Sequence, residues 1–355
     1  PSWAVLLSIV ATETSTVTFL SIPGITFASQ GDFRFLQITF GYVVGRLLVV
    51  WLLLPLYFEG RPFTSYEVLE RRVGKQSRRL ASVLFLATRN LSDALRLYLT
   101  ALALREATGI SLTVSVLSLG VVTIAYTYLG GVRSVIWNDC IQFTLYMVGA
   151  LSAAWIICQR IPGGAEHVWQ CAAESGKWRL LDFDLSLTKP TMTFWSGLIG
   201  GAFLTLATHG TDQLTVQRCL AARSQRAASW AMAASGLVVL LQFALFLAIG
   251  AALACYYDAF PPSAALTDRD KDRAFAYFIV NDLGRGLAGF TLAAVFAAAM
   301  STLSSSLNSS ATALVNDVYL PMQREPVDSA RQLRIGRWAT AAFGVLQVVL
   351  ALASH

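Results

Sequence analysis

The sequence predicts an all-α integral membrane protein, and three observations lead to that fold class. The 355 residues are 55% hydrophobic and only 14% charged, with a mean hydropathy of +0.57. A soluble domain usually carries about 25% charged residues. The apolar residues gather in runs long enough to cross a bilayer, and some runs carry polar interruptions. The runs are too long and too uniformly apolar to be the strands of a membrane barrel.

Taken in order, the apolar runs predict about nine transmembrane helices in a single domain over 1–355. The expected helices are 3–28, 35–58, 80–104, 110–129, 134–158, 191–216, 228–257, 286–316 and 335–354. The chain begins at Pro1 without an initiator Met and stops at His355, directly after an apolar run. We therefore expect it to be a fragment of a longer protein.

Basic residues predict the orientation of these helices. They follow every second run: Arg61, Arg71, Arg72, Lys75, Arg78 and Arg79; Arg133; Arg218, Arg223 and Arg226; Arg324, Arg331, Arg334 and Arg337. Short basic loops face the cytoplasm, so residue 1 is expected to start there, in a multi-pass protein of the cell (inner) membrane. Because this pattern accounts for the net charge of +6, we expect no nucleic-acid partner.

Neither the spacing of the cysteines nor any common catalytic motif indicates a metal site or an enzyme. Cys140, Cys158, Cys171, Cys219 and Cys255 form no CxxC or CxxH pattern, so we expect neither a metal cluster nor a disulfide framework. The chain has no HExxH or GxSxG motif and no Cys/His pair placed for catalysis. We expect no enzyme activity and no organic cofactor.

Two of the predicted helices are interrupted by polar residues. The first carries Glu13 and Thr18 in a hydroxyl-rich stretch before Pro23-Gly24, and the sixth carries Thr205, His209 and Asp212. Breaks at matching places in two halves predict inverted repeats around a binding site at the membrane midplane. The repeats would be 1–158 and 190–355, the second without its last helix. The alternative is that these hydroxyl groups only bond within a helix or between helices.

The run 286–316 is rich in small and hydroxylated residues. Ala298, Ser301, Thr302, Ser304 and Ser305 follow one another closely there. Hard cations prefer oxygen ligands, and a monovalent cation needs few formal charges around it. The run therefore favours a sodium site, with close helix packing through small residues as the alternative.

The third predicted helix carries three charges on one face. Arg89, Asp93 and Arg96 are spaced four and three residues apart, and Arg46 lies within the second helix. An intramembrane arginine often marks a solute pathway and binds carboxylates through two parallel hydrogen bonds. We hypothesise that Arg96 or Arg46 contacts an acidic or zwitterionic solute. The alternative is an internal network that pairs Glu13 with Arg46, and Asp93 with Arg89 or Arg96.

At this point the sequence resembles the sodium/solute symporter family over nearly its whole length. The resemblance is carried by Ala298-Ala299-Met300-Ser301-Thr302 with Leu307–Thr312, by the stretch Tyr128–Asp139 that contains Gly130-Gly131 and Trp137, and by Asp212-Gln213 followed by Val216–Ala222. The family implies a LeuT-type inverted-repeat fold, with discontinuous helices one and six, and sodium-coupled import of a small organic solute by alternating access.

The resemblance also implies ion ligands. The main sodium site would use carbonyl groups of Ala11 and Thr14, the carbonyl of Ala298 and the hydroxyls of Ser301 and Thr302; the helix-one pair fits with a shift of one residue as well. A second sodium site would use Asp139, Ser304 and Ser305. The alternative for Asp139 is a position at the lipid headgroups, paired with Arg133.

Other roles stay open at this stage. The candidates for solute binding are Glu13, Thr18, Arg46, Arg96, Thr205 and His209, and Phe19 could stack on the solute unless it packs in the core. A sugar substrate is disfavoured because the family's polar sugar-binding residue is missing. A proton-coupled carrier using His209 and Asp212, or the membrane region of a sensor protein, are the alternatives. The solute, the number of sodium ions and the oligomeric state are not predicted.

Overall fold

Helices make up the architecture throughout the residues that the structure describes. The computed structural model describes residues 1–59, 64–130, 132–186, 191–262, 266–323 and 325–354. Its helices are α1 (Ser2–Glu13), α2 (Thr16–Phe27), α3 (Gln37–Leu48), α4 (Leu54–Phe58), α5 (Ser65–Val73), α6 (Lys75–Thr108), α7 (Leu112–Leu129), α8 (Val132–Arg160), α9 (Gly164–Glu174), α10 (Phe194–Gly210), α11 (Gln213–Leu220), α12 (Gln225–Ala259), α13 (Ala274–Asn281), α14 (Arg285–Ala313) and α15 (Ser329–Ala353). The predicted all-α class is confirmed.

The predicted count of nine transmembrane helices is wrong when the described helices are judged by their length and apolarity. Six are long and apolar enough to cross a membrane, and the bent pair α1 and α2 makes a seventh if it is one span. The third and sixth predicted helices fall short for different reasons. The helix α6 carries Arg89, Asp93 and Arg96 in its middle, and α10 ends after 17 residues.

The two predicted helix breaks are present, and each is closed by a capping side chain. The axes of α1 and α2 differ by 64°, and Ser15 accepts a hydrogen bond from the Thr18 backbone N–H at the start of α2. Between α10 and α11, Asp212 Oδ1 accepts from the Leu214 backbone N–H at 2.8 Å. The first backbone N–H groups of a helix have no carbonyl partner within that helix, and a capping side chain accepts hydrogen bonds from them. The caps therefore stabilise both breaks. Pro23 lies inside α2 and does not interrupt it.

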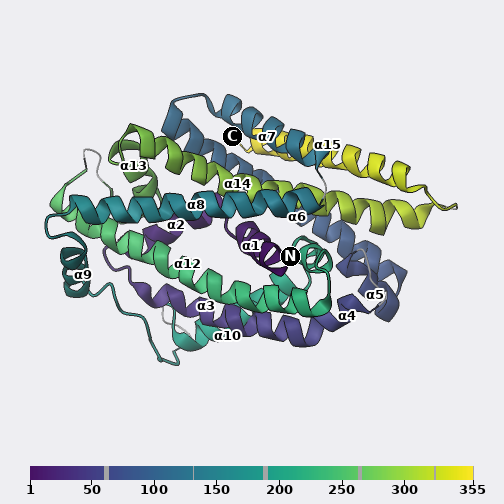
Figure 1. Cartoon of the computed structure of the whole chain (residues 1–355), viewed down its shortest axis with the longest axis horizontal. Coiled ribbons are helices and arrows are strands. Elements are labelled where there is room, and N and C mark those ends of the chain that lie inside the picture. The colour runs from purple at the N-terminus through teal and green to yellow at the C-terminus, as the bar shows by residue number, and fades with distance from the viewer. Residues whose placement is uncertain (60–63, 131, 187–190, 263–265, 324, 355) are drawn as a thin grey trace.

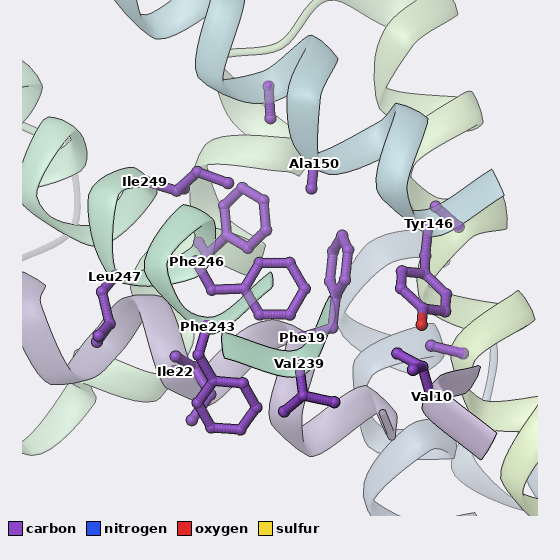
Figure 2. Close-up of a cluster of buried hydrophobic side chains, with 14 of the residues drawn as sticks. Val10, Phe19, Ile22, Tyr146, Ala150, Val239, Phe243, Phe246, Leu247 and Ile249 are labelled. Atoms are coloured by element: carbon purple, nitrogen blue, oxygen red, sulfur yellow. The ribbon is translucent and has the colours of Figure 1, made fainter. Parts of the chain in front are cut away.

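The broken helix α1/α2 lies at the centre of the bundle. Figure 1 shows α1 between the long helices α8 and α12, with α14 running alongside α8. Figure 2 shows Phe19, just after the break, enclosed by apolar side chains of α12 and α8. Its ring lies 5.4 Å from Phe246 and 6.4 Å from Tyr146 between centroids. Phe19 therefore belongs to the core and does not face a solute pocket.

Glycines bring α3 and α10 into backbone contact. A Cβ atom added to Gly41 would lie 2.4 Å from the Gly197 carbonyl oxygen, and one added to Gly201 would lie 2.4 Å from the Ile38 carbonyl oxygen. Small residues permit this approach, which is how helices associate where no water is available to drive packing. The contact holds α10, the first half of the sixth predicted helix, against α3, which belongs to the second predicted helix.

A disulfide corrects the expectation of none. Cys171 of α9 and Cys255 of α12 are bonded across a sequence separation of 84 residues. Short cysteine motifs do not reveal such a long-range pair, which forms only because the chain folds α9 back onto the end of α12. Near this bond, Lys177 Nζ donates to the carbonyls of Thr26 and Ala28 at the end of α2, at 2.7 and 3.1 Å. Burial lowers the pKa of Lys177 below its usual range.

Most of the basic residues expected in loops lie in helices instead, and Arg78 and Arg218 are two examples. Arg78 is in the first turns of α6, where it pairs with Glu70 and with the buried Asp317. Arg218 is in α11 and is 3% exposed, because the sixth predicted helix continues to Leu220. Arg61, Gly131, Arg324 and residue 190 lie outside the described residues, as does the side chain of Arg133.

Candidate functional site

Arg46 joins the two helix breaks. Its side chain, fully buried in α3, forms an ion pair with Glu13, the last residue of α1. The same guanidinium lies 3.2 Å from His209 Nε2 near the end of α10, and its Nε donates to Ser235 Oγ of α12 at 2.9 Å. His209 Nε2 is in turn 3.4 Å from the Glu13 carboxylate. These groups therefore form the internal network that was the alternative to solute binding by Arg46.

Asp93 is the centre of a second network on α6. Its carboxylate pairs with Arg89 at 2.9 Å and with Arg96 at 3.0 Å, and it accepts a hydrogen bond from Ser306 of α14. Arg89 also lies 3.8 Å from Asp212, at the break between α10 and α11. The predicted pairs of Asp93 are confirmed, and they connect the third predicted helix to the hydroxyl-rich face of α14.

Arg96 differs from Arg46 and Arg89 because more of its side chain is accessible. Its side chain is 37% exposed, and its one described polar contact besides its own carbonyl is with Asp93 through Nη1. It lines a cavity of about 10 Å³ whose walls also include Ser15 and Thr16 at the helix-one break and Thr100 of α6, together with Ala299, Thr302 and Leu303. That volume has room for about one water molecule. A solute could enter only if these walls moved apart.

Thr302 brings α14 to the end of α1. Its hydroxyl donates to the Thr12 carbonyl at 3.2 Å, and it lies 3.5 Å from the carbonyl oxygen of Ala298. Across the break, the described backbone hydrogen bonds include one to the Val10 carbonyl but none to those of Ala11 or Thr12. Carbonyl oxygens in this last turn are thus available to a cation beside a hydroxyl of α14.

The remaining predicted ligands of the main sodium site are arranged differently. Ser301 turns away from α1's end and donates to Asp139 Oδ1 at 2.6 Å. The Thr14 hydroxyl faces α12, where Gln242 Nε2 donates to it at 2.7 Å. The main set of Ala11, Thr14, Ala298, Ser301 and Thr302 is therefore split: of its three α14 residues, only Thr302 has a described hydrogen bond to α1.

Asp139 lies at the centre of the second predicted ion site. It is fully buried, and it accepts hydrogen bonds from Ser8 of α1 at 2.5 Å and from Ser301 of α14. Its ion partner is Arg218 of α11, at 3.1 Å. The carboxylate has no exposed surface, and the side chain of Arg133, its partner in the alternative, lies outside the described residues. Ser305 contacts Arg218, and Ser304 donates to the Ser301 carbonyl at 3.2 Å.

Two other solute candidates have structural roles. Thr205 is buried at the contact of α10 with α3, where its Cβ would lie 2.6 Å from a Cβ added to Gly45. Thr18 completes the capping box with Ser15 at the start of α2. The structure brings neither of them to the cavity beside Arg96.

Sequence reasoning missed three residues of this region. Arg218 was assigned to a loop, although its position in a motif shared with the family was noted. Ser8 and Gln242 were not singled out, because a single polar residue within an apolar run carries little signal. The Gln242 side-chain oxygen is buried without a described hydrogen-bond partner, so this glutamine keeps one acceptor unused next to the helix-one break.

Comparison with known proteins places this geometry in context. The sequence model of the sodium:solute symporter family matches residues 1–355. A sodium/sialic acid symporter, NanT of Aliivibrio fischeri, is 33% identical over 98% of this chain and 68% of its own length. The sodium-coupled monocarboxylate transporter 2 of Danio rerio is 29% identical over 99% of this chain, which spans only 56% of that protein.

A solved structure gives the same backbone arrangement. It is described as the substrate-bound outward-open state of a Na+-coupled sialic acid symporter with a novel Na+ site. The TM-score is 0.91 at 29% sequence identity, and the match covers all of this chain and 74% of the other. The neighbouring structures have the LeuT-type fold, and this chain shares it.

Proposed function

Because the chain belongs to the sodium:solute symporter family, we propose that it is the membrane core of a symporter that couples the inward flow of sodium to import of a small organic acid. The observation that carries the solute class is Arg96, an accessible cation in a cavity at the helix-one break. The named solutes of the two relatives, sialic acid and monocarboxylates, are both acids.

The proposed main sodium site lies between the end of α1 and α14. The contact of Thr302 with the Thr12 carbonyl supports it, because it places a hydroxyl beside carbonyl oxygens that the helix break leaves without backbone donors. We retain Ala11, Thr14 and Ala298 as proposed carbonyl ligands and Ser301 as a proposed hydroxyl ligand. Sodium bound there would need Ser301 to rotate away from Asp139. The set Asp139, Ser304 and Ser305 is the proposed second site.

The proposed transport cycle follows from the two breaks. We propose that 1–158 and 190–355 are inverted repeats and that the bundle alternates between outward-open and inward-open forms. Sodium at the helix-one break would order the wall of the Arg96 cavity, so sodium and solute would raise each other's affinity equally. Each positive charge that moves inward gains about 2.3 kcal/mol per 100 mV of membrane potential, which drives accumulation of the solute.

The proposed orientation places residue 1 in the cytoplasm. The Cys171–Cys255 disulfide supports it, because α9 follows α8 on the side that the basic loops assign to the exterior. Disulfides persist in oxidising compartments outside the cytoplasm.

Replacing Arg96 tests the solute class. Lysine keeps the positive charge but loses the planar fork that binds a carboxylate through two hydrogen bonds. We expect Arg96→Lys to raise the half-saturating concentration of an acidic solute about 10- to 100-fold, since hydrogen bonds to charged groups contribute about 1.5–3 kcal/mol. Sodium-driven uptake of the acid and of its neutral amide is measured in proteoliposomes. Equal residual uptake of both by the variant and by the unmodified protein would exclude carboxylate recognition at Arg96.

A further inference from the structure

Arg218 occupies the middle of the second predicted ion site. It belongs to α11, the short second half of a broken helix, and its side chain is 4% exposed. The guanidinium contacts three other helices at once: Ser8 on α1, Asp139 on α8 and Ser305 on α14. A fourth contact, from Nη1 to the Leu214 carbonyl at 2.6 Å, fixes the side chain along its own helix.

The atoms around this guanidinium are those that a sodium ion would take. Asp139 Oδ2 lies 3.1 Å from Arg218 Nη2, Ser8 Oγ lies 2.9 Å from Nε, and Ser305 Oγ accepts from Nη2. A carboxylate and two hydroxyls make an oxygen-rich site for a hard cation. In the described conformation, the Arg218 guanidinium supplies the positive charge that a sodium ion would otherwise supply at this position.

Charge balance decides whether sodium can share the site. The described charged groups in direct contact here are one carboxylate, Asp139, and one guanidinium, Arg218, so the pair is neutral. A sodium ion added beside Arg218 would leave one uncompensated positive charge buried among four helices, which is strongly unfavourable. If Arg218 withdrew, sodium would restore the balance.

We propose that Arg218 is a tethered cation that competes with sodium for Asp139, Ser8 and Ser305, so that the second ion site is closed while α11 packs against α1 and α14. Sodium enters only when α11 moves away, which ties occupancy of the site to the position of this half-helix. The inference rests on the proposed sodium coupling and extends it to the number of ions bound in each conformation.

The number of sodium ions bound per protein tests this competition. Equilibrium binding of sodium-22 is measured on the purified full-length protein in detergent, without solute. We expect Arg218→Gln to bind one ion more than the unmodified protein, because the carboxylate is left without a cation. The double variant Arg218→Gln/Asp139→Asn removes both charges and is expected to return to the unmodified number.

A third variant keeps the test valid if Arg218→Gln does not fold. In the unmodified protein, Asp139 is held by Arg218 and not by sodium, so Asp139→Asn is expected to leave the number of bound ions unchanged. Loss of one ion in Asp139→Asn, or no gain in a folded Arg218→Gln, would overturn the proposal. Each result is the difference in the number of bound sodium ions between a variant and the unmodified protein. Failure of the main sodium site would be seen in a separate measurement, because Thr302→Ala would then leave sodium binding unchanged.

Discussion

Thr302 is the side chain on which the main ion site depends most directly. Its hydroxyl lies 3.2 Å from the Thr12 carbonyl, and Thr302 is 2% exposed. A sodium ion at this point would gain a hydroxyl ligand beside the Thr12 carbonyl, whereas Ser305 of the same helix reaches the Thr12 hydroxyl, at 3.4 Å. Ser309, on the same helix, is as deeply buried but donates only to its own helix, to the Ser306 carbonyl at 3.0 Å. It is therefore a matched control.

Thr302→Ala is expected to weaken sodium binding about 10- to 100-fold, because loss of a ligand to a charged group costs about 1.5–3 kcal/mol. Bound sodium stabilises the folded state by mass action, so thermal unfolding in sodium against potassium reports the change. The sodium-dependent shift in Tm should fall in Thr302→Ala and persist in Ser309→Ala. An undiminished shift in Thr302→Ala would place the ion elsewhere.

At the scale of elements, the pair α3 and α10 forms a rigid unit that carries Arg46 and His209. Their backbones meet through Gly41, Gly197 and Gly201, so any added side-chain atom strikes a main-chain atom. The ion pair of Arg46 with Glu13 then links this unit to α1. If α1 moves during a transport cycle, either the Arg46–Glu13 ion pair breaks or α3 and α10 move together with α1.

Two neighbouring glycines of α10 test this packing. A Cβ at Gly201 would lie 2.4 Å from the Ile38 carbonyl oxygen, whereas one at Gly200 meets nothing within 4 Å. We expect Gly201→Ala to destabilise the protein by about 1–3 kcal/mol through overpacking, while Gly200→Ala is neutral or slightly stabilising. Thermal unfolding of both variants in detergent measures the difference. Equal stability of the two would contradict the close approach of α3 and α10.

At the scale of the whole molecule, composition and polar patterning predicted the fold class and the two helix breaks. Glu13 and Asp212 indicated the breaks, because placing a charge within an apolar run costs free energy unless the charge has a function or a partner. The pairing of Glu13 with Arg46 and of Asp93 with Arg89 and Arg96 was among the stated alternatives, because the charges fall at helical spacing or in adjacent spans.

Other features depend on contacts between distant segments, which local patterns do not encode. The Cys171–Cys255 bond joins residues 84 positions apart, and Arg218 reaches Asp139 of α8 from a helix that packs against α1 and α14. The count of nine spans was wrong because it included the third predicted helix despite its three charges, and because the sixth ends its first helical segment at Gly210.

The central claim, sodium-coupled import of an organic acid, is tested most directly by uptake into proteoliposomes that contain the purified full-length protein. The acids named for its relatives, sialic acid and monocarboxylates, are offered with an inward sodium gradient or with the same gradient of potassium. The account predicts that an acid accumulates above its external concentration with sodium alone, and faster when the interior is negative. Equal uptake in sodium and potassium would contradict it.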